Sequence, residues 1–328
     1  MLRKLIVAVI VLGLIGLAGF YVLTIPYSLA ASDLPDHKPD VANGKYLFAA
    51  GGCESCHAAP ASDKCDDKRV KDQEVLAGGR CLLTPFGTFN VPNISPDPDH
   101  GIGKWTPAQF VNAMKYGVAP DGSHLYPAFP YPSYQHMKVE DLIDLKAYLD
   151  TLPASKNVVP PHNLSFPFSF RRGLGLWKLL YVNGQEVAPP ANATPAVARG
   201  AYLTLGPGHC SECHSPRNII GGIIASRAFS GGPSPVGGGF IPNITSDDET
   251  GIGKWPENDI AQSFKDGFKP SRDGGLSIDS YGSDMAAVQR NLAQLSDDDR
   301  TAIAAFLKTL PPVKSAKPVQ KTTPAAGS

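Results

Sequence analysis

The sequence predicts a mainly α-helical protein that consists of one apolar N-terminal segment followed by two similar domains. Three observations lead to this prediction: a charge-free stretch near the N-terminus, an internal repeat, and apolar residues at helical spacing with few alternating stretches. The 328 residues carry 30 Lys and Arg against 30 Asp and Glu, so the formal net charge is zero. This balance gives no general attraction to nucleic acid, and no nucleic-acid partner is expected. Six cysteines are too few for a disulfide-built scaffold.

Residues 1–30 are predicted to form a transmembrane anchor. Arg3 and Lys4 precede residues 5–25, which carry no charge. At about 1.5 Å per residue this helix would match the roughly 30 Å of membrane hydrocarbon. The alternative is a cleaved signal peptide, with residues 28–30 as the cleavage site. Both interpretations keep the N-terminus in the cytoplasm and place the rest of the chain in an exported, oxidising compartment.

An internal repeat organises the rest of the chain. Residues 91–94 and 101–105 recur as 241–244 and 251–255, at an offset of 150. Upstream, a Cys-x-x-Cys-His motif at 53–57 recurs at 210–214. The two domains are therefore predicted at 41–153 and 196–312. The first has about seven extra residues between its two motifs, and this stretch contains Cys65 and Cys81.

Short helices with long loops are predicted in each domain. Thr106 and Gln109 can form a capping box at a helix that Gly117 ends. Residues 139–152 have apolar side chains at helical spacing and form the last helix of the first domain. The second domain ends in the same way, with Ser296 as the cap of its last helix.

Two segments lie outside the repeats. The interdomain linker, 154–195, is strongly apolar at 164–170 and 174–181. We expect it to pack along both domains, and a partner or membrane-surface contact is the alternative. The tail, 313–328, consists mostly of Lys, Pro, Thr, Ala and Ser and is expected to be disordered.

The pattern Cys-x-x-Cys-His is that of covalent c-type haem attachment. One helical turn brings two thiols to the two vinyl groups of a porphyrin, and the adjacent histidine reaches the iron. Two copies within a repeat predict two covalently attached haem c groups. The expected thioether cysteines and iron-binding histidines are Cys53, Cys56, Cys210, Cys213, His57 and His214. A zinc site or a thioredoxin-like dithiol is the alternative.

The sixth iron ligand is expected to be methionine in both domains. The part of the chain after His214 contains no histidine and a single methionine, Met285. Met285 is therefore favoured as the ligand in the second domain, and the alternative is that it is a core residue beside an open iron. In the first domain Met137 is favoured because a two-residue gap would align it with Met285, whereas Met114 aligns with Phe264. The remaining alternatives there are His136, His124, Met114 and His100. Methionine ligation raises the reduction potential and suits electron relay.

Further residues have structural and cofactor alternatives. Cys65 and Cys81 are predicted to form a disulfide, because an exported thiol pair usually oxidises. The alternative is that one thiolate ligates a haem. Four repeated residues are candidate hydrogen-bond donors to the haem propionates: Asn93, Trp105, Asn243 and Trp255. The alternative is that the asparagines fix turns and the tryptophans pack in the core.

With these motifs the chain resembles the multihaem cytochrome c subunits of membrane-bound bacterial dehydrogenases that act on alcohols, gluconate or fructose. The likeness covers roughly residues 40–312 and includes 125–131. It implies two class I-like cytochrome c domains in tandem. Segments similar to 133–137 and 284–288 carry methionine ligands in that family. Two features differ: many relatives carry three haems, and Phe129 occupies a position that is often methionine.

The resemblance implies a non-catalytic electron-transfer subunit of an oxidoreductase complex. It would be a single-pass protein of the bacterial inner membrane with its haem domains in the periplasm. Electrons would pass from a dehydrogenase catalytic subunit to quinone, another cytochrome or a terminal oxidase. The alternative is a dihaem enzyme of the thiosulfate dehydrogenase or peroxidase type, which Phe129 and the Cys65 and Cys81 pair leave open. A haem sensor or assembly protein is a third class, which no residue favours.

Overall fold

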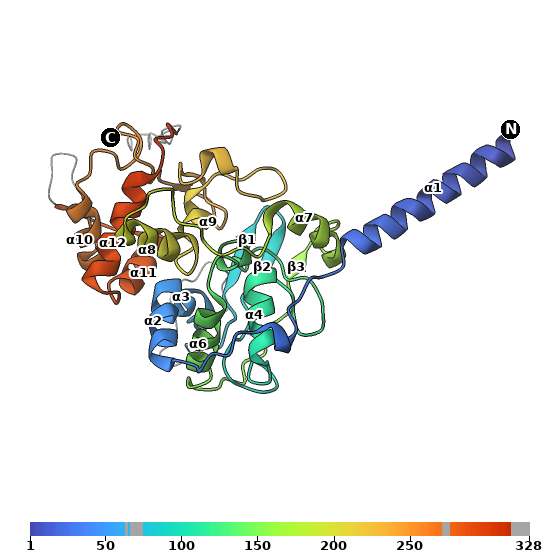
Figure 1. Ribbon diagram of the computed structural model, residues 1–328, viewed down its shortest axis with the longest axis horizontal. Coiled ribbons are helices and arrows are strands. Elements are labelled where there is room, and N and C mark those ends of the chain that lie inside the picture. Colours follow the sequence, from blue (N-terminus) through green and yellow to red (C-terminus); the bar gives the residue numbers. More distant parts are fainter. Residues whose placement is uncertain (63–64, 66–74, 271–275, 316–328) are drawn as a thin grey trace, which may run out of the picture. The chain divides into compact units, whose positions relative to one another are not determined.

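The computed structural model describes residues 1–62, 65, 75–270 and 276–315 (Figure 1). The chain divides into two compact units. The first comprises Met1–Ala188 with Leu205–His209, and the second comprises Pro189–Thr204 with the chain from Cys210 onward. Most of the predicted interdomain linker therefore belongs to the first unit.

The first unit begins with an apolar helix, α1 (Leu2–Leu23), in which no residue is buried. Among the described residues, α1 is the helix that is long and apolar enough to cross a membrane. It starts before the charge-free stretch and includes Arg3 and Lys4. A signal sequence near the N-terminus can pass the same test of length and composition, so α1 is a candidate membrane span by these two properties.

The rest of the first unit consists of short helices and one small sheet. Its helices are η1 (Ala31–Asp33), α2 (Val41–Gly51), α3 (Cys53–His57), α4 (Pro107–Tyr116), α5 (Tyr131–Tyr134), α6 (Val139–Leu149), η2 (Arg171–Gly173) and α7 (Leu174–Tyr181). Its antiparallel sheet contains β1 (Cys81–Thr84), β2 (Gly87–Asn90) and β3 (Asn163–Leu164) in that order. The mainly helical class is thus confirmed for this unit.

The second unit also consists mainly of short helices. They are α8 (Pro195–Leu205), α9 (Cys210–His214), η3 (Ala225–Arg227), α10 (Glu257–Asp266), α11 (Ser283–Leu292) and α12 (Asp297–Thr309). Its strands pair as β4 (Gly232–Pro233) with β5 (Phe240–Ile241) and β6 (Phe268–Pro270) with β7 (Leu276–Ser280). The expected disorder does not begin at residue 313, because the Val313 and Ser315 amides donate to Thr245 and Thr250. Residues 316–328 of the tail lie outside the described residues.

The predicted helix ends are formed by local hydrogen bonds. The Gln109 amide donates to Thr106 Oγ1 at 3.2 Å, and the Thr106 amide donates to Gln109 Oε1 at 2.9 Å. Gly117 ends α4 in the left-handed conformation, with a φ of 59°. Ser296 caps α12 by accepting from the Asp299 amide at 3.1 Å. Helix α6 ends at Leu149, three residues before the predicted end.

In each unit a glycine lets two helices cross closely, α2 with α6 in the first unit and α8 with α12 in the second. A Cβ added to Gly44 of α2 would lie 2.0 Å from the Asp144 carbonyl oxygen of α6. The corresponding Cβ at Gly200 of α8 would lie 1.8 Å from the Ala302 carbonyl oxygen of α12. Any larger residue would force these backbones apart. The same crossing therefore fixes the helix pair in both units.

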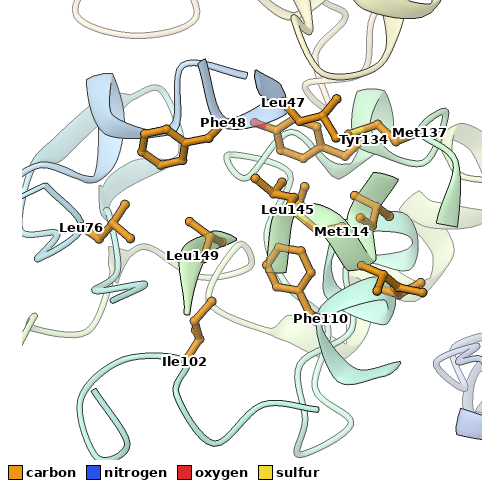
Figure 2. Packing of buried hydrophobic residues seen from close by; sticks show 13 residues of the cluster. Leu47, Phe48, Leu76, Ile102, Phe110, Met114, Tyr134, Met137, Leu145 and Leu149 are labelled. Atoms are coloured by element: carbon orange, nitrogen blue, oxygen red, sulfur yellow. The ribbon is translucent and has the colours of Figure 1, made fainter. Parts of the chain in front are cut away.

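The core of the first unit fills the space between α2, α4 and α6. Its fully buried side chains include Leu47, Val111 and Leu142, and Met137 is 1% exposed in the same cluster. Figure 2 shows Met137 beside Tyr134 in this cluster. Burying such side chains is the main stabilising term for a unit of this kind.

An ion pair joins the segment before α2 to α6. His37 Nε2 lies 2.7 Å from Asp144 Oδ1. The hydrogen bond to Asp144 raises the pKa of His37. Burial alone would raise the pKa of Asp144, but hydrogen bonds from the Asn43 side chain, the Asp40 amide and His37 lower it overall.

Replacing His37 by glutamine is expected to reduce stability over a limited pH range. The raised pKa of His37 stabilises the fold below pH 6.5, and this contribution is lost as the pH rises through the folded-state value. The lowered pKa of Asp144 stabilises the fold above pH 3.8, and this contribution is lost as the pH falls through its folded-state value. Melting temperatures of the two proteins should therefore differ most near pH 5 and converge above neutrality. A constant difference up to pH 9 would contradict the ion pair.

The sheet of the first unit contains pairings that the sequence did not indicate. Strands β1 and β2 form a hairpin in which Cys81 lies opposite Asn90. Strand β3 comes from the predicted linker and pairs with β2 through Gly87 with Leu164 and Thr88 with Asn163. The linker thus contributes a strand to the first unit.

Candidate functional site

Each Cys-x-x-Cys-His motif forms a single helical turn, α3 in the first unit and α9 in the second. The four motif cysteines carry thiols and not disulfides. Burial raises the pKa of Cys53 to about 12, and the neighbouring Cys56 adds to this shift. Burial and Cys213 have the same effect on Cys210, whose pKa is also about 12. Each motif therefore holds its first cysteine, Cys53 or Cys210, as a neutral thiol on a single helical turn.

The histidine of each motif is oriented by a proline carbonyl. His57 Nδ1 lies 2.8 Å from the Pro92 oxygen, and His214 Nδ1 lies 2.8 Å from the Pro242 oxygen. A carbonyl oxygen only accepts hydrogen bonds, so Nδ1 carries the proton and donates. The lone pair is then on Nε2, as a metal-binding imidazole requires. Burial lowers the pKa of His57 to about 4 despite the Pro92 hydrogen bond, and it lowers the pKa of His214 as well.

A glycine holds the same backbone contact behind each histidine. The Gly78 amide donates to the His57 carbonyl at 2.6 Å, and the Gly231 amide donates to the His214 carbonyl at 2.7 Å. Both glycines have positive φ, at 67° and 72°. A Cβ at Gly78 would lie 2.4 Å from the Pro92 carbonyl carbon, which leaves space only for glycine. The two units therefore share the local geometry around the histidine.

An arginine also supports each motif, and no sequence pattern pointed to either of the two arginines. Arg80 donates to the Ser55 carbonyl at 2.9 Å, and Arg217 donates to the Glu212 carbonyl at 2.8 Å. Along the sequence, Arg217 follows its cysteine motif closely, whereas Arg80 is separated from its motif by the insertion of the first domain. Comparison of the repeats could therefore not pair them. The proline carbonyls could have been found, because Pro92 and Pro242 lie within the repeated motif.

The structure places Met137 in the same core cluster as a motif cysteine. Met137 is 1% exposed, and Cys53 and Trp105 pack against the cluster to which it belongs. The Met137 carbonyl accepts a hydrogen bond at 2.7 Å from Lys115 Nζ. Lys115 is 2% exposed, and burial lowers the pKa of its amine. The loop that carries Met137 is thus tied to α4.

The other candidate ligands of the first unit have different surroundings. Met114 lies in the core cluster and is 6% exposed. His124 Nε2 lies 2.9 Å from the Thr24 carbonyl oxygen, at the end of α1. His136 Nδ1 lies 2.8 Å from the Gln185 oxygen, and His100 Nδ1 lies 3.1 Å from Asp97 Oδ1. Of the methionines in this unit, Met137 is the one on the loop before α6 that the repeat aligns with Met285.

In the second unit Met285 is half-buried and lies in the first turn of α11. Phe264, at the repeat position of Met114, is buried at 7% exposure. This burial agrees with the interpretation of position 114 as a core position. Met285 as a ligand remains a prediction.

The asparagines that recur in the repeat hold loop backbone in the structure. Asn93 Nδ2 donates to the Ser155 carbonyl at 2.7 Å, and Asn243 Nδ2 donates to the Val313 carbonyl at 2.7 Å. Their Oδ1 atoms accept from the backbone amides two residues later, at 2.9 and 2.8 Å. The structure thus shows the loop alternative for both asparagines. Propionate contacts remain predictions for all four residues, Asn93, Trp105, Asn243 and Trp255.

Cys65 and Cys81 are joined as a disulfide, with their Cα atoms 5.1 Å apart. The bond connects the start of β1 with the insertion of the first unit. Both sulfur atoms are engaged with each other, so the structure does not support the alternative in which one thiolate binds a haem.

The residues of both motifs fit a covalently bound haem. Each motif offers two thiols on one turn and an imidazole whose Nε2 carries the lone pair. Within the described part of the chain, no three His, Cys, Asp or Glu side chains converge in a way that could hold a metal ion by themselves. The zinc alternative therefore has no support in the structure, whereas the donor set for haem is present twice.

Comparison with known proteins shows the class of protein that this fold and these motifs define. Residues 41–153 match the family model for cytochrome c. A dihaem cytochrome c-type protein of Cereibacter sphaeroides is 49% identical over 84% of this chain and 87% of its own length. The chain belongs to the cytochrome c family, and its cofactor is covalently bound haem c.

Other relatives are subunits of larger enzymes. The cytochrome c subunit of a quinone-dependent alcohol dehydrogenase from Gluconacetobacter polyoxogenes is 36% identical over 88% of this chain and 60% of its own length. The gluconate 2-dehydrogenase cytochrome c subunit of Pantoea cypripedii is 35% identical over 82% of this chain and 59% of its own length. The chain spans about three-fifths of these two subunits.

Proposed function

We propose that this chain is a membrane-anchored dihaem cytochrome c that relays single electrons from a dehydrogenase catalytic subunit to a downstream acceptor. That acceptor would be quinone, another cytochrome or a terminal oxidase. The observation that carries the proposal is the repeated geometry of the motifs. Two Cys-x-x-Cys-His turns each have a histidine whose Nδ1 donates to a proline carbonyl at 2.8 Å. The names of the relatives, a dihaem cytochrome and two dehydrogenase subunits, support the haem count and the partner class.

In this proposal each unit is a cytochrome c domain. Cys53, Cys56, Cys210 and Cys213 form the thioether bonds, and His57 and His214 bind the irons. The matching glycine crossings of α2 with α6 and of α8 with α12 support the tandem arrangement. Helix α1 would cross the bacterial inner membrane, with both domains in the periplasm.

The residues of the chain favour electron transfer without proton transfer. When bound, haem c supplies an iron that accepts and returns one electron. The proton on Nδ1 of each histidine is held by a carbonyl oxygen, which cannot take it up as a base. Met137, the proposed sixth ligand of the first iron, is 1% exposed in an apolar cluster. A methionine sulfur at that position would fill the coordination sphere of the first iron and leave no site on it for a substrate.

A spectroelectrochemical titration of the full chain in detergent tests the relay. We expect two transitions at positive potentials, each with the methionine-to-iron charge-transfer band near the red end of the spectrum, and no binding of carbon monoxide to the reduced protein. Methionine at both irons predicts this result because it raises the potential and fills the coordination sphere. A low-potential or high-spin haem that binds carbon monoxide would instead support a dihaem enzyme.

A further inference from the structure

Helix α7 of the first unit buries its lysine and exposes an apolar face to solvent. Leu176, Leu179 and Leu180 are 41%, 61% and 69% exposed. Their spacing places them on one face of the helix. Lys178, on the opposite face, and Gly175, beside it, are buried. A surface helix of a water-soluble domain shows the reverse pattern.

Contacts of the buried face fix this orientation. Lys178 Nζ donates to the Gly117 carbonyl at 2.6 Å, at the C-terminal end of α4. The same amine lies 5.1 Å from the centre of the Tyr131 ring. Gly175 fits against α1, since a Cβ there would lie 2.6 Å from Thr24 Cα. The outward position of the leucines therefore follows from specific contacts on the other side of the helix.

Three aromatic side chains before α7 add to the exposed apolar surface. Phe166, Phe168 and Phe170 are 84%, 41% and 54% exposed. We call the set of Phe166, Phe168, Phe170, Leu176, Leu179 and Leu180 the apolar patch. All six lie within fifteen residues of the chain, and a concentration of exposed apolar side chains of this kind points to an interaction surface.

The apolar patch adjoins the C-terminal end of α1, as Figure 1 shows for α7. Phe170 stacks on Phe20 with ring centroids 6.0 Å apart. Arg172 donates to Thr24 Oγ1 at 2.8 Å and to the Tyr21 carbonyl at 2.9 Å. Its guanidinium also lies 4.5 Å from the centre of the Tyr21 ring. These contacts hold the patch at the C-terminal end of α1. If α1 spans a bilayer, this end lies at the membrane surface.

We infer that the apolar patch docks onto the bilayer surface on the side where α1 leaves the membrane. The occupant is lipid, and the argument is the continuity of the patch with the proposed span. An apolar helix face that lies in the interface buries its side chains at the boundary between headgroups and acyl chains. The inference rests on the membrane anchoring proposed above. It adds that the first unit is held against the membrane by a second contact besides α1.

Spin labels on the full, haem-loaded chain can test this inference. The proposed thioethers and the disulfide occupy the native cysteines, so a single introduced cysteine would be the only reactive thiol. The variants are Leu180→Cys in the patch, Leu12→Cys in α1 and Val158→Cys as the control. Val158 is 72% exposed in the first unit and lies outside the patch. Each labelled protein is placed in nanodiscs of phosphatidylethanolamine and phosphatidylglycerol, one chain per disc, and its exposure to oxygen and to a water-soluble nickel chelate is measured.

We expect the ratio of oxygen to nickel accessibility to be severalfold higher at position 180 than at position 158, and highest at position 12. A high ratio at 12 with equal ratios at 180 and 158 would overturn the docking and leave the anchor intact. A low ratio at 12 would overturn the anchor and the docking with it. A label at 180 that is immobilised and shielded from both reagents would show a protein-covered surface, which also overturns lipid docking.

Discussion

Replacing Cys53 and Cys56 together by serine is expected to lower the haem content of the chain from two to one. Serine cannot form the thioether bonds that hold haem c, so the first motif would lose its cofactor while the second keeps it. The matched double replacement of Cys210 and Cys213 should also leave one haem. The measurement is the haem content per chain from the pyridine haemochrome spectrum, together with the mass of the intact chain.

The cysteines of the disulfide provide the control. The double variant Cys65→Ser and Cys81→Ser should retain two haems, because these sulfur atoms are bonded to each other in the structure. A chain without Cys53 and Cys56 that still carried two haems would contradict the assignment. If the Cys65 and Cys81 variant kept both haems but changed the spectrum of one iron, a sulfur of this pair would be a ligand after all.

Replacing Met137 by leucine is expected to abolish the methionine-to-iron band of one haem and to lower its potential. Leucine has nearly the volume of methionine but no sulfur, so the apolar cluster stays filled while the ligand is lost. The potential should fall by about 0.1 V or more, within the roughly 0.8 V that axial ligands span. The open position on the reduced iron should then bind carbon monoxide. Redox titration and the carbon monoxide difference spectrum measure both effects.

Met114→Leu is the matched control in the same cluster. Met114 is 6% exposed and Met137 is 1% exposed, so both replacements change the same kind of buried site. The control should keep the band, the potential and the resistance to carbon monoxide. If Met114→Leu removed the band and Met137→Leu did not, the ligand would be Met114, and the repeat alignment of Met137 with Met285 would be wrong.

The sequence allowed good predictions where the determining contacts are local. The Thr106 and Gln109 capping box, the left-handed Gly117 and the Ser296 cap each depend on residues within one or two helical turns. The Cys-x-x-Cys-His turns are also local, because all five residues lie on one short helix. Such features can be recognised without knowledge of the tertiary structure.

Features that depend on distant residues could not be predicted in this way. The pairing of β2 with β3 joins residues 87–88 to 163–164, and neither short segment has a strand pattern of its own. The outward face of α7 was also not predictable, because leucines are expected inside unless other contacts decide the orientation. Here the Lys178 and Gly175 contacts with α4 and α1 decide it.

The hydrogen bond from Lys115 to the Met137 carbonyl gives the two otherwise similar units different electrostatics. The repeat counterpart of Lys115 is Lys265, whose side chain is 48% exposed and pairs with Asp297 at 3.3 Å. The histidines of the two motifs do not distinguish the units, since Nδ1 of each donates to a proline carbonyl at 2.8 Å. A buried ammonium disfavours further positive charge nearby, and oxidation of an iron adds such charge. If Met137 and Met285 are the ligands and Lys115 keeps its proton, the first haem would have the higher reduction potential, and a single electron shared by the two haems would rest mainly in the first domain.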